Sequence, residues 1–343
     1  MRHQSSSLYW ALLVGFIAFC LFSITPAQPV RGQTDQLFVS EEGTSEECTQ
    51  SAPCALDTAQ MKWQNGDTVY IQGGYYRIFS TIDIWESVTL VGGWDGAGDG
   101  EVVIDPEENR TTLLHWATNA PVFYVRYVNP LKISGIFFTG NLQQVISING
   151  RSTLVLESNY FDDIESAVVC TEPANIIAVN NIFNRCGEVF FSSIPAGTNQ
   201  SIYLINNTFN MVDKAINMAN FEVFAMNNIF SKVDSDVING KDSYVYASKN
   251  LFYESDNPGD LLSGSWFSGD PSFVDPSSGN FHISEISPAR NAGISMYIPG
   301  YRTVTVDYDG EARPNEGKYD IGADEFYGPG MDMVLTFFPI FMN

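Results

Sequence analysis

The sequence predicts an all-β solenoid that is built from coils of about 22 residues. A short motif, Asn-x-Phe in most copies and "GIFF" in the first, recurs between residues 131 and 255. Its phenylalanines, spaced 24, 22, 26, 21 and 22 residues apart, are Phe137, Phe161, Phe183, Phe209, Phe230 and Phe252. Self-similarity at this period indicates one structural unit that stacks on copies of itself.

Each coil is expected to contain three short strands. Before each phenylalanine, apolar residues alternate with period 2, which is typical of a strand with one buried face. The inward positions of this strand are Leu154, Ile176, Ile202, Val223 and Val245, followed by Leu156, Ala178, Leu204, Ala225 and Ala247. After the phenylalanine, the inward positions of a second strand are Ile164, Cys186, Val212 and Val233, and those of a third are Val168, Phe190, Ile216 and Val237.

A polar column accompanies these apolar columns. Two residues before the phenylalanines stand Asn159, Asn181, Asn207, Asn228 and Asn250. Asparagine tolerates the left-handed backbone of a tight turn, and its amide can form a hydrogen bond with the same amide one coil away. We therefore expect an asparagine ladder at the turn between the first and second strands.

Three strands per coil, inward columns and a ladder together resemble the right-handed parallel β-helix of the pectate-lyase-like superfold. A leucine-rich horseshoe fits poorly, because no repeat carries its leucine spacing. A solenoid grows by adding coils, so we expect one single-stranded right-handed parallel β-helix domain over residues 28–330.

The start of the chain is expected to direct export. Residues 1–27 combine a weakly basic start, an apolar run from 8 to 24 and the small residue Ala27, which is typical of a secretory signal peptide; an uncleaved membrane anchor is the alternative. In an oxidising compartment, Cys48 and Cys54 around a short polar loop favour a disulfide. Cys170 and Cys186 fall in inward columns, where they are either packed thiols or bonded across the interior.

The opening coils carry a predicted cap. Residues 55–63, "ALDTAQMKW", have a short helical pattern, and a helix there would cover the open end of the solenoid. The following loop at 92–101 holds Asp95, Asp99 and Glu101 among glycines. These oxygens could ligate calcium, or the loop is only a flexible turn.

Two C-terminal stretches, 270–293 and 306–326, resemble the choice-of-anchor Q module of bacterial surface proteins. The matching motifs are Asp270-Pro271, Phe273-Val274-Asp275-Pro276, Ser287-Pro288-Ala289, Asn291-Ala292-Gly293, Asp309-Gly310 with Arg313-Pro314, and Asp320-Ile321-Gly322-Ala323 before Glu325-Phe326. The resemblance implies an exported β-helix that closes with residues 270–326, and it implies no particular chemistry.

An apolar tail, residues 331–343, follows the hinge-like Gly328-Pro329-Gly330. It is too short to cross a membrane, so we expect no transmembrane span in the mature chain. The tail either docks on the solenoid or stays free to engage the cell surface.

Charge and residue placement argue against several functions. The net charge of −23 disfavours nucleic acid and anionic lipid surfaces as partners. Lyases and hydrolases of the superfold require clustered ionisable groups over one sheet. The positions aligned with that groove are nearly bare: Ala167 and Val169, Val189 and Phe191, Ala215 and Asn217, and Asp236 and Ile238. His115 and His282 are expected to be structural, and no catalytic residue is predicted.

Carboxylates are expected to stack on one turn edge. Four residues after successive phenylalanines stand Glu165, Asp213, Asp234 and Asp256, with Glu188 beside the gap at Gly187. At a spacing of about 4.8 Å, such charges repel and favour a bound Ca²⁺. A solvated acidic edge is the alternative.

An outward column of apolar residues forms the second candidate site. Val155, Ile177, Tyr203, Phe224 and Tyr246 stand six residues before the phenylalanines. A soluble surface rarely shows such a strip unless something covers or binds it. Either sugars stack on Tyr203, Phe224 and Tyr246, or another segment or protein covers the strip.

These observations predict a secreted or cell-surface protein that acts as a monomer. Its expected function is non-catalytic attachment to the surface or contact with a glycan, the partner being a polysaccharide or another cell-surface component. A polysaccharide lyase or glycoside hydrolase of the same superfold is the alternative.

Overall fold

The computed structural model describes residues 35–115, 120–192, 194, 200–239, 242–255, 258–259 and 264–328. All of these residues belong to one compact unit. The predicted signal peptide, Asp256 and the apolar tail lie outside the described residues. Among the described residues, no helix has both the length and the apolar character that a bilayer crossing requires.

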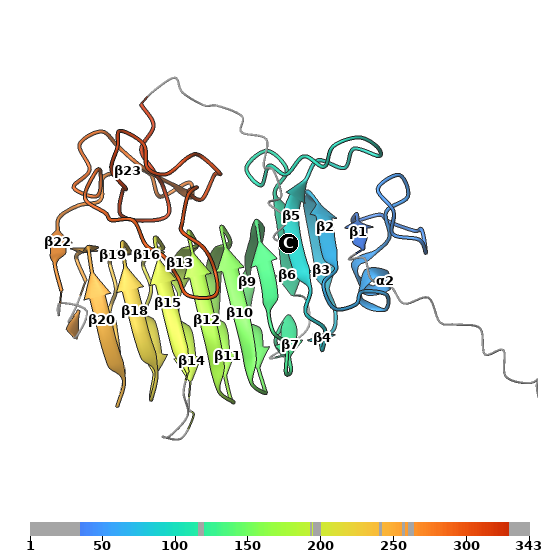
Figure 1. Cartoon of the computed structure of the whole chain (residues 1–343), viewed down its shortest axis with the longest axis horizontal. Helices are drawn as coiled ribbons and strands as arrows, with labels where there is room; N and C mark the ends of the chain where they lie inside the picture. The colour runs from blue at the N-terminus through green and yellow to red at the C-terminus, as the bar shows by residue number, and fades with distance from the viewer. Residues whose placement is uncertain are drawn as a thin grey trace, which may run out of the picture. The chain divides into compact units, whose positions relative to one another are not determined.

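The chain folds as a parallel β-helix with three walls, as the sequence predicts (Figure 1). The first wall is a nine-stranded sheet whose neighbours all pair in parallel. In spatial order its strands are β1 (Gln36–Val39), β2 (Thr68–Gln72), β5 (Thr89–Trp94), β8 (Leu131–Ser134), β10 (Ser152–Glu157), β12 (Ala174–Val179), β15 (Ser201–Ile205), β18 (Glu222–Met226) and β20 (Tyr244–Ser248).

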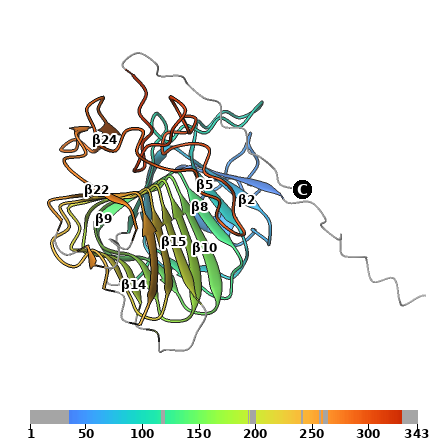
Figure 2. The same cartoon turned by 60° about the vertical axis from the view of Figure 1, so that its left-hand side comes forward.

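The second and third walls belong to one 13-stranded sheet, because two long strands bend from one wall into the other. The second wall contains β3 (Gly74–Ile78), β6 (Thr111–His115), the first halves of β9 (Ile136–Ile148) and β11 (Tyr160–Cys170), β13 (Ile182–Cys186), β16 (Thr208–Asn210), β19 (Ile229–Ser231), β21 (Asn250–Tyr253) and β22 (Trp266–Ser268). The third contains β4 (Ile82–Ile84), β7 (Phe123–Val125), the second halves of β9 and β11, β14 (Glu188–Ser192) and β17 (Lys214–Met218). The three walls enclose one continuous apolar core (Figure 2).

The predicted inward positions lie in the core, with one correction of register in the first copy and one in the last coil of the third wall. From Phe161 to Phe252 the phenylalanines pair in register and their rings stack 4.9 to 5.3 Å apart. In the first copy, however, Phe138 and not Phe137 pairs with Phe161. Phe137 points outward against Tyr160, because a shift of one residue moves a side chain to the other face of a strand.

The asparagine ladder is present and fully buried. From Asn181 onward, each amide oxygen accepts hydrogen bonds from the preceding asparagine, as in the bonds from Asn181 N and Asn181 Nδ2 to Asn207 Oδ1 at 2.9 and 3.1 Å. The Oδ1 atom of Asn159 accepts the backbone N–H of Ile136 at 3.1 Å. The left-handed residues are not the ladder asparagines, as the sequence suggested, but those just before them. They are Ser158, Asn180, Asn206, Asn227 and Lys249, with φ between 52° and 60°.

The N-terminal end is capped as expected. Helix α2 (Leu56–Gln60) buries Leu56 and Ala59 against the first coil of the core. Cys48 and Cys54 form the predicted disulfide. Cys170 and Cys186 are free and buried, which confirms packed thiols, and burial raises the pKa of Cys170 to about 12.

After β22 the described residues, up to 328, add no further coils. Residues 269–328 contain only the antiparallel hairpin of β23 (Phe273–Asp275) and β24 (Asn280–Ile283) and run back beside the C-terminal ends of the first-wall strands (Figure 1). In each Asn-Asn pair, the second asparagine forms the ladder. The first donates a side-chain hydrogen bond to a backbone carbonyl of this C-terminal segment. The bonds run from Asn180 Nδ2 to the carbonyl of Val306 (2.8 Å), from Asn206 Nδ2 to that of Asp320 (3.0 Å) and from Asn227 Nδ2 to that of Ile294 (2.7 Å).

Candidate functional site

The predicted apolar strip exists as one row on the outside of the first wall. Its members are directly paired across neighbouring strands in the order Val155, Ile177, Tyr203, Phe224 and Tyr246. The register therefore brings together all three residues that the sequence proposed for ligand contact.

A loop of the C-terminal segment covers the first half of the strip. Ile298 and Val304 are buried against Val155 and Ile177, which are only 4% and 5% exposed. Arg302 forms an ion pair with Glu157 at the end of β10 and so holds the loop to the wall. Figure 1 shows the loop crossing this face. For this half of the strip, cover by another segment of the chain is confirmed.

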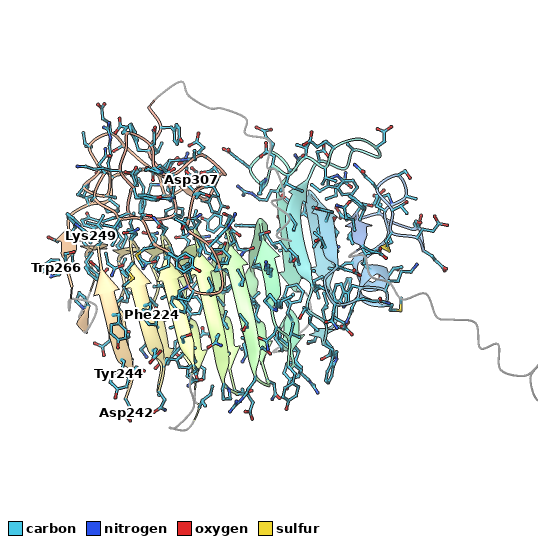
Figure 3. The ribbon with its side chains drawn as sticks, viewed as in Figure 1. Phe224, Asp242, Tyr244, Lys249, Trp266 and Asp307 are labelled. Atoms are coloured by element: carbon cyan, nitrogen blue, oxygen red, sulfur yellow. A yellow bond between two sulfur atoms is a disulfide. The ribbon has the colours of Figure 1, made fainter. Side chains whose placement is uncertain are left out.

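The described residues cover Tyr203 only in part and leave the far end of the strip open. Tyr203 and Phe224 are half-buried, whereas Tyr246 is 50% and its neighbour Tyr244 is 71% exposed. Figure 3 shows Phe224 and Tyr244 on this wall below the C-terminal segment, with Tyr244 farther from that segment than Phe224. Within this strip, the described part of the chain thus leaves aromatic surface open on the last two first-wall strands, β18 and β20.

Ring geometry narrows what this surface can bind. Tyr203 stacks on Phe224 with centroids 4.6 Å apart, and Phe224 stacks on Tyr246 at 5.0 Å. Both ring faces of Phe224 are therefore occupied by its neighbours. Within this stack of three rings, a sugar can therefore stack on the face of Tyr246 that points away from Phe224, but not on Phe224.

The predicted acidic edge lines a hollow of about 610 Å³ between the second and third walls. Glu165, Asp213 and Asp234 all line it, as expected. Glu188 does not, because it turns to Lys214 Nζ at 3.0 Å and accepts a hydrogen bond from Asn217 Nδ2 at 2.9 Å. Asp256 lies outside the described residues.

Two cations that the sequence analysis missed lie among these carboxylates. Arg185 and Lys232 line the same hollow at the left-handed turn positions, two residues after their phenylalanines. Arg185 pairs with Asp162 at 2.5 Å. Burial raises the pKa of Asp162, and the charge of Arg185 opposes this shift. Because basic side chains already interleave the carboxylates, the edge attracts calcium less than a purely acidic column would. In the other candidate calcium site, Asp95 Oδ1 accepts the backbone N–H of Ala97, which is the bond of a tight turn.

The outer face of the third wall differs from the expected bare groove. Ala167, Val189, Ala215 and Ile238 do not face outward but lie in the core, so that part of the alignment is wrong. In the last coil, Ile238 and not Val237 pairs with Ile216. The wall also carries the pair of Glu188 and Lys214 described above.

At its N-terminal end, the third wall presents a charged aromatic cluster. Arg126 lies over the rings of both Trp85 and Tyr124, at 4.7 and 4.3 Å, and 4.0 Å from Asp83. These residues precede the phenylalanine repeat, so no sequence period indicated that β4 and β7 would bring them together.

Comparison with known proteins adds little to this description. No family model matches the sequence, and no curated protein matches it. Among solved structures, the crystal structure of pectate lyase Pel9A is similar, with a TM-score of 0.34 and 12% identity over 85% of this chain and 97% of the other. This likeness assigns no chemistry to the chain. The parallel register of its own coils defines the fold.

Proposed function

We propose that this protein is an exported, non-catalytic β-helix protein that contacts a glycan at the cell surface through the open end of its apolar strip. One observation carries the proposal: a single outward column is covered at Val155 and Ile177 and left open at Phe224 and Tyr246. Exposed aromatic surface of this kind, continuous with a covered strip, is typical of an interaction site.

The chemistry of the open end suits a sugar. Tyr246 offers one ring face for stacking, and the hydroxyl groups of Tyr244 and Tyr246 can donate or accept hydrogen bonds. The exposed carboxylate of Glu222 begins β18 and is paired with Tyr244 in the sheet register. A few polar groups around an aromatic platform can orient a polyhydroxylated ligand.

Three features support export and surface attachment. Residues 1–27 have the pattern of a signal peptide, the disulfide between Cys48 and Cys54 suits an oxidising compartment, and residues 270–326 resemble the choice-of-anchor Q module. Attachment through that region or through the tail is part of the proposal.

Binding is tested with the mature chain and a panel of neutral and acidic glycans. We expect Tyr246→Ala to weaken binding about threefold to tenfold, which corresponds to about 0.5–1.5 kcal/mol for one ring contact. Tyr75→Ala is the matched control, because Tyr75 is 64% exposed on a different wall. Equal binding by the wild type and both variants would show that the open strip is not the site.

The same panel, incubated with calcium, tests the non-catalytic part. We expect no reducing ends and no unsaturated uronates to form. Their release by the wild type would instead establish the polysaccharide lyase or glycoside hydrolase alternative.

Deleting residues 331–343 separates the tail from the strip as the means of attachment. We expect an unchanged thermal midpoint and a loss of cell association, as a free tail would give. A lower midpoint together with new binding of a hydrophobic dye would show that the tail docks, and that the strip is covered from within the chain.

A further inference from the structure

Three metal-ligating side chains converge in the C-terminal segment. His282 lies on β24, and Asp309 and Asp324 come from two later loops. The Nδ1 atom of His282 is 2.9 Å from Asp324 Oδ1 and 3.8 Å from Asp309 Oδ2. All three donor atoms lie within 4.8 Å of one another. Figure 3 labels Asp307, which belongs to the same loop as Asp309.

The backbone holds these groups in place. Asp324 Oδ2 accepts the N–H of Ile283 at 2.7 Å, which ties this carboxylate to β24. Asp307 is fully buried and accepts the N–H groups of Asp309, Glu311 and Glu325 at 3.1, 2.8 and 3.0 Å. Asp307 thereby joins the loops that carry Asp309 and Asp324 and acts as a positioning residue.

Charge at this point is unbalanced. Two carboxylates that are only 13% and 8% exposed face one imidazole, and Glu107 adds a further negative charge that acts on both His282 and Asp309. Within the described part of the chain, the carboxylate of Asp309 accepts no conventional hydrogen bond, although it points at His282. Buried like charges repel strongly and are stabilised by a bound cation.

We propose that His282, Asp309 and Asp324 bind a divalent transition metal ion such as Zn²⁺ or Mn²⁺, which ties β24 to the two loops. One imidazole nitrogen with two carboxylate oxygens suits these ions, whereas calcium takes oxygen ligands. Ligand atoms about 2.0–2.2 Å from a metal lie roughly 3–4 Å from one another, so the observed spacings require only small movements.

Metal binding is tested on the mature chain without a polyhistidine tag, after treatment with a chelator. Zn²⁺, Mn²⁺ and Ca²⁺ are titrated separately by calorimetry and followed by thermal melts. We expect one site per chain, binding of Zn²⁺ or Mn²⁺ at least about tenfold tighter than of Ca²⁺, and a higher midpoint with the bound ion.

Asp309→Asn is the informative variant, because it removes a ligand oxygen without removing a hydrogen bond of the fold. We expect it to weaken binding by at least about tenfold while the metal-free melt stays close to that of the wild type. His282→Gln should weaken binding as strongly. The control is Asp213→Asn with Asp234→Asn on the acidic edge, which should bind the ion as the wild type does.

Two results would overturn the proposal. Absence of saturable binding, or unchanged affinity in Asp309→Asn, would show that His282 and Asp324 form only an ion pair. Loss of binding in the control variant instead would place the ion at the acidic edge.

Discussion

Replacing Asn207 by alanine is expected to lower the free energy of unfolding by about 2–5 kcal/mol, because several buried groups lose their partners at once. Asn207 is fully buried in the middle of the ladder. Its Oδ1 atom accepts the backbone N–H of Asn181 at 2.9 Å, and its Nδ2 atom donates to the carbonyl of Ala178 at 2.8 Å. Neither backbone group can turn to solvent, so each is left unpaired at about 1–3 kcal/mol.

A matched control lies three residues further along the same coil. Asn210 is 5% exposed and belongs to a shorter polar row, in which its Nδ2 atom donates to Asn184 Oδ1 at 2.8 Å and its Oδ1 atom accepts from Ser231 Oγ at 3.0 Å. These partners are side chains and can rotate toward other groups. Asn210→Ala should therefore lose only about 1 kcal/mol.

Denaturant melts of both variants measure the difference. Because a solenoid transmits stability between neighbouring coils, a defect in one central coil should lower the midpoint of the whole transition. Equal losses of unfolding free energy in Asn207→Ala and Asn210→Ala would show that the ladder's hydrogen bonds to the backbone stabilise the fold no more than the side-chain hydrogen bonds of Asn210.

Within the repeats, the sequence carried most of the information. Every coil there places the same residue type at the same inward position, so period-2 alternation and the Asn-x-Phe motif are enough to set walls, register and ladder. The first copy failed because "GIFF" lacks the asparagine that marks the turn, and either of its two phenylalanines could then be aligned. The structure selects Phe138, which stacks on Phe161.

Sites that depend on long-range packing could not be predicted. The strip was visible as a column, but its cover comes from Ile298 and Val304, which are more than 100 residues away from the strand they cover. The cation–π contact of Arg126 with Trp85 and the cluster around His282 both lie outside the phenylalanine repeats, so no sequence period predicted them. One local signal in the sequence could have indicated where the C-terminal segment binds. The doubled asparagines, such as Asn206-Asn207, supply one residue for the ladder and one for binding the C-terminal segment.

The largest effect is expected from breaking the ion pair of Arg313 and Glu325, whose side chains are both 0% exposed at an N–O distance of 3.0 Å. Glu325→Gln should destabilise the C-terminal segment by about 3–5 kcal/mol, because it removes the carboxylate that pairs directly with the buried charge of Arg313. Arg313→Met should cost as much, since Arg313 also donates to the carbonyls of Gly322 and Ala323 at 2.8 and 2.6 Å.

The two single variants must be compared with the double variant Arg313→Met/Glu325→Gln. Each single variant leaves one member of the pair charged without the other, whereas the double variant leaves neither. We therefore expect the double variant to lose about 1–3 kcal/mol less than the sum of the two single losses. Full additivity would mean that the two residues stabilise the segment independently through their backbone contacts.

The readout distinguishes local from global unfolding. The segment is held to the coils by hydrogen bonds from Asn180, Asn206 and Asn227, by the apolar cover of the strip and by two apolar clusters that it forms with second-wall strands. The coils keep their own continuous core inside the walls. We therefore expect Glu325→Gln to release the segment before the β-helix melts, which exposes Val155 and Ile177 to a hydrophobic dye and residues 294–308 to protease at temperatures where the β-sheet signal is unchanged. Simultaneous loss of both signals would show that the segment and the coils unfold as one cooperative unit, in which case the buried ion pair stabilises the entire solenoid and not only its covering segment.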